Sequence, residues 1–173
     1  SNEQFRNFAI TKQGLATGDN NRFLRYWGEV FLNQVTYDIE TYEDSRDYSL
    51  QWVPYSKGGE SRKWYGNNEL IVYWGNGGKI IRNFKDDKGN ERSRFRAYEY
   101  YFKSALTWSL ISSNTFAVRL RNQGFVFDIN GMSGFSFKEQ NKKYLLAFLN
   151  SKIALKILDV LNPTLAFQKG DIE

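Results

Sequence analysis

Apolar residues gather in short runs over most of the chain and recur with helical spacing only near its end. The short runs are rich in β-branched and aromatic residues and are bounded by Gly, Asn, Asp or Ser, which is the pattern of strands. The predicted strands are Tyr48 to Tyr55, Glu69 to Trp74, Thr107 to Ile111, Phe116 to Leu120 and Phe125 to Ile129. Turns are predicted at Asn76-Gly77-Gly78 and Asp87-Lys88-Gly89-Asn90, whose residues tolerate positive φ. We expect an antiparallel or mixed sheet.

The segment Lys142 to Leu161 predicts one long amphipathic helix. Its apolar residues at spacings of three and four are Leu145, Leu146, Leu149, Ile153, Ile157 and Leu161. Ser136 and Glu139 have the spacing of a capping box, and Asn162-Pro163 ends the helix. Shorter helices are expected around Asn20 to Asn33 or Tyr98 to Lys103.

Together the elements predict a single α/β (mixed α+β) domain over residues 1–173, with Ser1-Asn2 typical of a tag remnant. With 41% hydrophobic and 17% aromatic residues, the chain is rich enough to build a core. No apolar run approaches the ~20 residues of a membrane helix, so no membrane partner is expected.

The chain has no Cys and no His. Disulfides, cysteine-based zinc sites and Ser-His-Asp triads are therefore excluded, and so is the commonest general base. The absence of a disulfide framework favours an intracellular, cytoplasmic location. Gly77-Gly78-Lys79 lacks the upstream glycine and the hydroxyl residue of a phosphate-binding loop, and Trp74 to Gly78 falls short of a dinucleotide fingerprint because no helix is expected directly after it.

Charge is segregated along the chain. The net charge of +5 favours a polyanionic partner, and residues 57–96 carry ten basic against five acidic residues. Acidic residues cluster at Asp38, Glu40, Glu43, Asp44 and Asp47. Their spacing matches no metal-ligand loop, so a solvated surface is expected, or a face that keeps DNA away. A hydrolase or nuclease would need a cluster of metal-binding carboxylates, for which Asp128 and Glu139 are too isolated.

One stretch interleaves basic, aromatic and amide side chains within a dozen positions. Its members are Lys57, Arg62, Lys63, Trp64, Tyr65, Asn67 and Asn68. Basic groups neutralise phosphates, Asn and Arg pair with base edges, and aromatic rings stack on bases, so this mixture suits a DNA reader. The alternative is that Trp64 and Tyr65 close the core beneath a basic turn.

A second row, Arg92, Arg94 and Arg96, alternates with Ser93 and Phe95. In a strand the three guanidinium groups would share one face, and Arg119 and Arg121 repeat the spacing. Such rows suit a phosphate track, but a solvated sheet face paired with acids has the same pattern.

Three separated motifs carry a family resemblance. They are residues 12–23 (Lys-Gln-Gly-Leu-Ala-Thr-Gly-Asp-Asn-Asn-Arg-Phe), Lys57-Gly58-Gly59-Glu60 with residues 62–67 (Arg-Lys-Trp-Tyr-Gly-Asn), and residues 162–168 (Asn-Pro-Thr-Leu-Ala-Phe-Gln) with Gly170-Asp171-Ile172. Together they resemble the C-terminal part of the large adenine-specific methyltransferases of bacterial phage-exclusion (BREX-type) systems and related restriction-modification enzymes. Residues 145–151 also resemble a helix of TaqI-like and type I specificity-subunit recognition domains.

This resemblance implies a DNA target-recognition domain that follows a catalytic domain dependent on S-adenosylmethionine. The Asn/Asp-Pro-Pro-Tyr/Phe signature of the catalytic domain is absent here, since Asn162-Pro163-Thr164 lacks the second proline and the aromatic residue. We therefore expect this chain to bind double-stranded DNA and to lie beside the catalytic domain of the same polypeptide. No catalysis, cofactor or metal site of its own is expected.

By the same resemblance, two motifs supply the candidate DNA-binding residues, and the arginine row is added to them. The candidates are Gln13, Thr17, Asn20, Asn21, Arg22, Lys57, Arg62, Lys63, Trp64, Asn67, Asn68, Arg92, Arg94 and Arg96. Alternatively the motif glycines Gly14, Gly18, Gly58, Gly59 and Gly66 shape turns, and loops such as Ile81 to Arg96 read the bases. A second hypothesis is a module that docks the methyltransferase to other defence proteins through the helix of residues 142–161 or the acidic stretch.

Overall fold

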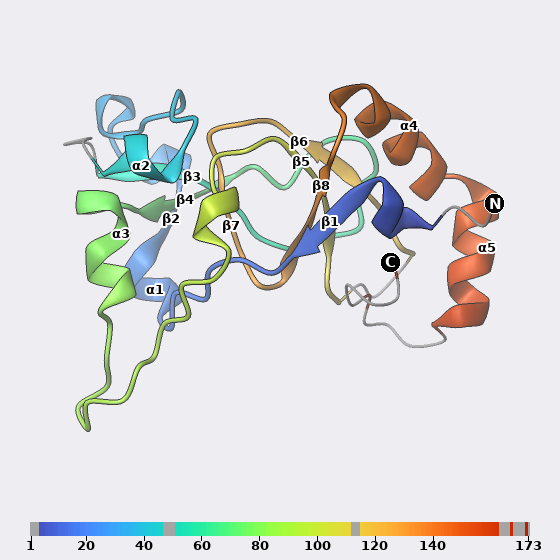
Figure 1. Cartoon of the computed structure of the whole chain (residues 1–173). Coiled ribbons are helices and arrows are strands. Elements are labelled where there is room, and N and C mark those ends of the chain that lie inside the picture. Colours follow the sequence, from blue (N-terminus) through green and yellow to red (C-terminus); the bar gives the residue numbers. More distant parts are fainter. Residues whose placement is uncertain (1–3, 47–50, 112–114, 163–166, 168–171, 173) are drawn as a thin grey trace.

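The computed structural model describes residues 4–46, 51–111, 115–162, 167 and 172 and shows two four-stranded sheets (Figure 1). The first sheet has the order β1-β8-β5-β6 and is antiparallel throughout. The second has the order β2-β4-β3-β7 and is mixed, because β3 and β7 run parallel. The strands are β1 Ala9–Lys12, β2 Leu24–Tyr26, β3 Trp52–Ser56, β4 Leu70–Tyr73, β5 Ala105–Ser109, β6 Arg119–Arg121, β7 Val126–Phe127 and β8 Gly131–Ser136. The predicted α/β class is confirmed.

The helices lie at the two ends of the molecule. They are α1 Asn20–Phe23, α2 Tyr42–Ser45, α3 Gly75–Arg82, α4 Glu139–Leu149 and α5 Lys152–Leu161. In Figure 1, α4 and α5 (orange to red) stand beside the first sheet, and α1, α2 and α3 surround the second. Short 3-10 turns occur at Phe5–Asn7, Trp27–Glu29, Leu32–Gln34 and Tyr98–Tyr100.

The first sheet is buried on both faces. Leu106 and Trp108 of β5 contribute to a core cluster with Leu145 of α4 and Leu158 of α5. On the opposite face, Phe135 of β8 belongs to the cluster that fills the space around the second sheet. β5 is buried at every position, including its two polar residues Thr107 and Ser109.

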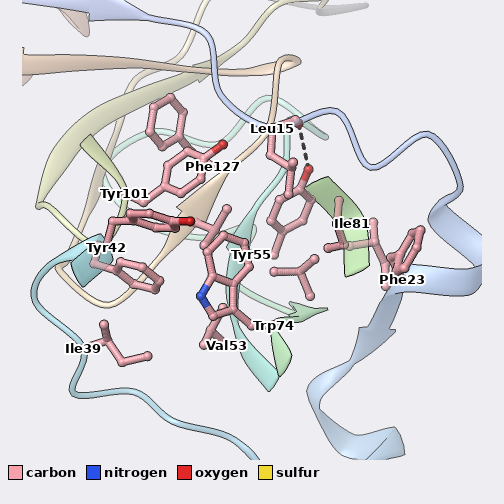
Figure 2. Packing of buried hydrophobic residues seen from close by; sticks show 14 of the residues in the cluster. Leu15, Phe23, Ile39, Tyr42, Val53, Tyr55, Trp74, Ile81, Tyr101 and Phe127 are labelled. Carbon is pink, nitrogen blue, oxygen red and sulfur yellow. Dashed lines mark hydrogen bonds between the residues drawn. The ribbon is translucent and has the colours of Figure 1, made fainter. Parts of the chain in front are cut away.

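The second cluster is dominated by aromatic rings (Figure 2). Trp74, which is 1% exposed, makes edge-on contacts with Tyr101 and Phe102 at centroid distances of 5.8 and 5.7 Å. Tyr101 in turn meets Phe127 at 5.4 Å. Edge-to-face pairs of this kind each contribute about 0.5–1.5 kcal/mol beyond the area they bury. The rings therefore fix how segments distant in sequence meet.

The predicted strands are found, with shifted bounds. Four of them correspond to β3, β4, β5 and β7, although residues 48–50 lie outside the described residues. The strand predicted from Phe116 begins only at Arg119. The reason is that the backbone of Val118 bonds to the Asn150 side chain and to Trp64 instead of to a sheet neighbour.

The single long helix of residues 142–161 is wrong. The segment forms two helices, which separate at Asn150 and Ser151. After this break α5 buries Ala154 and Leu158, while Ile153, Ile157 and Leu161 are 68%, 47% and 69% exposed. The apolar residues that have helical spacing in the sequence therefore do not form one buried face in the structure.

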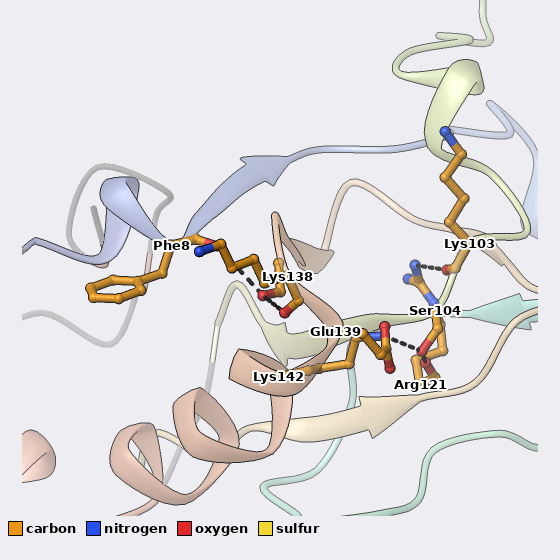
Figure 3. A network of polar contacts seen from close by, with 8 residues as sticks. Phe8, Lys103, Ser104, Arg121, Lys138, Glu139 and Lys142 are labelled. Carbon is orange, nitrogen blue, oxygen red and sulfur yellow. Dashed lines mark hydrogen bonds and ion pairs between the residues drawn. The ribbon is translucent and has the colours of Figure 1, made fainter.

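The predicted capping box is wrong as well. Ser136 Oγ donates to the Lys138 carbonyl at 2.7 Å, and Glu139 pairs with Lys142 at 2.6 Å. Figure 3 shows the resulting network, in which the Lys142 ammonium also donates to Ser104 Oγ at 3.0 Å. This network ties α4 to the first sheet rather than capping the helix.

Two other helix predictions are mostly wrong. Of Asn20 to Asn33, only Asn20–Phe23 is α-helical, and β2 follows at once. Of Tyr98 to Lys103, only a 3-10 turn forms. Conversely, a helical turn does follow the glycine turn at residues 76–78, contrary to expectation, although those three residues have the predicted positive φ.

Candidate nucleic-acid interface

The first motif lies against the row of arginines that was predicted from a distant part of the chain. The backbones of Ala16 and Arg94 exchange two hydrogen bonds, each 2.9 Å long. On one side of this pair, Arg96 donates to Gln13 Oε1 at 3.3 Å. On the other side Gly18, at φ 77°, passes so close to Arg92 that a Cβ would lie 2.7 Å from its carbonyl carbon. A side chain at position 18 would therefore separate the two segments.

The arginine row belongs to a hairpin, residues 83–97, which reaches away from the body of the molecule (Figure 1, light green). Backbone bonds join Arg92 to Phe84 and Asp86 to Asn90. At the tip, Asp86 accepts hydrogen bonds from the Lys88 and Asn90 amides and from the Asn90 side chain. The Asn90 side-chain bond is the main reason that the pKa of Asp86 is lowered. The predicted turn at residues 87–90 is thus confirmed.

Two arginines from the two segments share one aromatic ring. The guanidinium carbons of Arg22 and Arg92 lie 5.0 and 5.6 Å from the centroid of Phe84, which is within cation-π range. A pocket of about 410 Å³ beside this ring is lined by Arg22, Lys79, Lys85 and neighbouring residues. Neither arginine forms an ion pair within the part of the chain that the structure describes. Their charges therefore remain open to a ligand.

Arg92, Arg94 and Arg96 are all exposed, whereas Ser93 between them is buried. The predicted alternation is therefore present. The segment is extended but is not a strand of either sheet; it bonds only through isolated bridges. We call the exposed surface formed by residues 13–22 and 79–96 the hairpin face.

A polar pocket of about 220 Å³ adjoins the hairpin face. Thr17, Asn20 and Lys57, predicted from two different motifs, meet there with Asp128 and Asn130. Thr17 Oγ1 donates to Asn20 Oδ1 at 2.8 Å. A second pocket of about 420 Å³ extends this surface past Asn20, Asn21 and Lys57 to Arg25.

Asp128 is 3% exposed and is held in place by Tyr55. The Tyr55 hydroxyl donates to Asp128 Oδ2 at 2.6 Å, and the Asn130 amide donates to Oδ1 at 2.6 Å. Burial, followed by the charge of Asp128, raises the pKa of Tyr55 well above its ordinary value of 10. From the sequence, Asp128 was judged too isolated to form a site. Its position as a lone carboxylate within a predicted apolar strand was the signal that could have indicated a pocket residue.

Most of the second motif lies elsewhere. Lys63 Nζ donates to the Asn150 carbonyl at 2.9 Å, and Asn67 Nδ2 donates to the Glu60 carbonyl at 3.1 Å. Arg62 approaches Glu60 and Glu69 at 3.5 and 3.8 Å. Their polar groups thus serve the fold of this loop and its contact with α4.

Trp64 and Asn68 do not join the hairpin face either. The backbone of Trp64 bridges to β6, while its side chain is 53% exposed, so it does not close the core. Asn68 lines a different groove, of about 500 Å³, with Trp27, Tyr37 and Tyr65. The structure therefore splits the second motif, leaving only Lys57 beside the first.

Lys79, Phe84 and Lys85 were not among the predicted site residues. Phe84 is the platform for both arginines, and Lys79 and Lys85 line the pocket beside it. The alternative hypothesis, in which the loop of residues 81–96 reads the bases, includes Phe84 and Lys85 but not Lys79.

The suggested phosphate track at Arg119 and Arg121 is wrong as a surface feature, since each residue is 1% exposed. The described acids of the 38–47 cluster, Asp38, Glu40, Glu43 and Asp44, are exposed as expected for a solvated surface. Among the described residues we find no group of three or more potential metal ligands, and no helix there has the length and apolar character needed to cross a membrane.

No family model matches the chain, but two curated proteins are similar to it. The adenine-specific methyltransferase PglX of Lacticaseibacillus casei (strain Zhang) is 36% identical over 173 residues, which cover 99% of this chain and 14% of that protein. The adenine-specific methyltransferase BrxX of Escherichia coli O9:H4 (strain HS) is 35% identical over 165 residues, which cover 92% of this chain and 12% of that protein. The chain therefore spans a small part of the relatives that it matches, and the expected resemblance to adenine-specific methyltransferases is confirmed.

Proposed function

We propose that this chain is the DNA target-recognition module of an adenine-specific DNA methyltransferase from a bacterial phage-exclusion or restriction-modification system. The observation that carries the proposal is the hairpin face, where two separate segments present exposed arginines and amides together. The similarity to adenine-specific methyltransferases supports it, because a base-modifying enzyme needs a grip on the duplex around its target.

In this proposal different residues of the hairpin face contact the phosphates and the bases. Arg92, Arg94 and Arg96 hold the phosphate backbone, since they are exposed, extended in a row and form no ion pair with any described residue. Asn20 and Asn21 are exposed at the edge of the polar pockets and carry amides that pair with adenine edges. The chain transfers no methyl group itself. S-adenosylmethionine binds to the catalytic domain of the parent enzyme.

The test is a titration of the chain against a pool of random duplexes at low and physiological salt, with sequencing of the retained DNA. Recognition predicts an enriched motif whose binding weakens with salt. Salt-dependent binding without enrichment would reduce the function to a basic clamp. No binding at either salt concentration would contradict the proposal.

A substitution identifies the reading residues once a motif is known. Asn21→Ala should cost roughly 1–3 kcal/mol on the enriched site and much less on unrelated duplexes. The matched control is Gln140→Ala, at an exposed amide on α4, which lies at the opposite end of the molecule. It should leave the affinity for both the enriched site and unrelated duplexes unchanged. An equal loss on all duplexes would assign Asn21 to the backbone rather than to a base.

One observation favours a second function, which is docking to the rest of the parent methyltransferase. Ile153, Ile157, Val160 and Leu161 form an apolar stripe on α5 with exposures of 47% or more. Such a stripe on a soluble domain is typical of an interface. If it docks, Ile157→Glu weakens association with the separately produced remainder of the enzyme and leaves duplex binding by the isolated chain unchanged.

A further inference from the structure

Arg119 is a buried arginine whose guanidinium has no hydrogen-bond partner among the described residues. The residue is 1% exposed, and its Nε and both terminal guanidinium nitrogens lack an acceptor among the described residues. A buried charge of this kind costs several kcal/mol unless something pairs with it. The neighbouring strand residue Arg121 differs, because its guanidinium donates to Ser133 Oγ at 2.7 Å. It also donates to the Lys103 carbonyl at 3.2 Å (Figure 3).

A second arginine adds to the unbalanced charge. Arg62 lies near enough for its charge to lower the pKa of Arg119, after the larger effect of burial, to about 10. Arg119 therefore stays cationic at neutral pH. The charge of Glu69 raises the pKa of Arg119. Glu69 nevertheless pairs at the surface with Arg62, at 3.8 Å, and forms no ion pair with Arg119.

We propose that Arg119 and Arg62 form a binding site for a phosphate-type oxyanion, supplied either as free phosphate or by a nucleic-acid backbone. The planar guanidinium offers several donors in a fork that matches the oxygens of such an anion. Arg119 forms the buried floor of the site. Arg62, whose side chain is 49% exposed, completes it from the solvent side.

The loop of residues 59–67 lies on β6 at Arg119. Trp64 spans β6 on both sides of Arg119, because its amide donates to the Val118 carbonyl and its carbonyl accepts from Leu120, each at 2.9 Å. Trp64 holds a φ of 73°, which is unfavourable for so bulky a side chain, whereas Asn67, at a φ of 59°, is a residue type that tolerates this conformation. The guanidinium nitrogens of Arg119 are inaccessible while the loop lies on β6, so an anion of either source requires the loop to lift.

The experiment measures the thermal unfolding midpoint of the chain in increasing phosphate, with chloride at matched ionic strength as the reference. The site predicts a rise of roughly 3 to 5 °C for each tenfold increase in phosphate above its dissociation constant, beyond any change in chloride. Arg119→Met should abolish this dependence, and Arg6→Met, an exposed arginine in the first 3-10 turn, should preserve it.

Arg62→Gln gives a second test that does not disturb the buried strand, should Arg119→Met fail to fold. It should shift the phosphate dependence to several-fold higher concentrations. If wild-type protein responds identically to phosphate and chloride, or if Arg62→Gln leaves the response unchanged, the proposal is overturned and Glu69 supplies the counter-charge instead.

Duplex binding distinguishes the two sources of the anion. A several-fold loss of affinity in Arg62→Gln at fixed salt, together with the phosphate response of the wild type, identifies a DNA backbone phosphate. Unchanged affinity with the same phosphate response identifies a free anion. The thermal measurement contains no DNA, so failure of the target-recognition proposal would leave it intact.

Discussion

At the scale of single residues, Tyr55 shows how the polar pocket depends on the core. Its hydroxyl is fully buried and donates to the buried carboxylate of Asp128, which lines the pocket with Lys57. Tyr55→Phe removes that donor while keeping the ring. Because a buried acceptor then loses a bond, we expect a loss of about 1–3 kcal/mol in the free energy of unfolding, measured by urea denaturation. Tyr144→Phe, at an exposed tyrosine of α4, should cost almost nothing.

The same hydroxyl predicts a dependence on pH. Burial and Asp128 raise the pKa of Tyr55, so the folded state keeps this proton at a pH where the unfolded chain, with a pKa near 10, releases it. The stabilisation is therefore complete below about pH 10 and is lost as the pH rises towards the folded pKa. We expect the stability difference between wild type and Tyr55→Phe to narrow above pH 10, in denaturation curves recorded from pH 7 to 11. A stability difference that stays constant from pH 7 to 11 would mean that the Tyr55 proton does not cause the pH dependence.

At the scale of elements, Asn150 explains why one predicted helix became two. Its side chain accepts from the Val118 amide at 3.0 Å and donates to the Val118 carbonyl at 2.8 Å, and its carbonyl accepts from Lys63. Asn150→Ala removes both side-chain bonds to Val118, and we expect a loss of about 2–3 kcal/mol in the free energy of unfolding. Ser151→Ala should cost only about 1 kcal/mol, because it removes a single helix cap bonded to the Ala154 amide. Equal losses of unfolding free energy in the two variants would mean that the two bonds to Val118 stabilise the fold no more than a single helix cap does.

Local pattern predicted the elements best where burial and sequence agree, as in β4 and β5. It failed at β8, whose sequence contains two glycines and reads as a loop. At Gly134 the backbone passes close to two rings, since a Cβ there would lie 3.2 Å from the ring of Phe5 and 3.4 Å from that of Trp108. The helix break had the same kind of cause, since Asn150 bonds to a segment more than thirty residues away. Neither long-range contact is visible in local periodicity.

At the scale of the whole molecule, the candidate site was predicted in part. The first motif and the arginine row each had the composition of a nucleic-acid contact, but only the fold shows that they pair along Ala16 and Arg94. The second motif has an equally suitable composition, yet its Lys63 and Asn67 bond within the protein. Composition therefore indicates which residues suit DNA, and the topology decides which of them are available.

The position of the charges, rather than their number, should determine duplex binding. Replacing Arg92, Arg94 and Arg96 by Gln lowers the net charge from +5 to +2, and so does replacing Lys143, Lys152 and Lys156, which are exposed on α4 and α5. If the hairpin face contacts phosphates, the first variant loses up to about 0.9 per arginine from the slope of log affinity against log salt. The second variant should keep the wild-type slope, measured by fluorescence anisotropy from 50 to 200 mM salt. Equal reductions in both variants would mean that the chain attracts DNA only through its overall charge, and the hairpin face would then have no particular role.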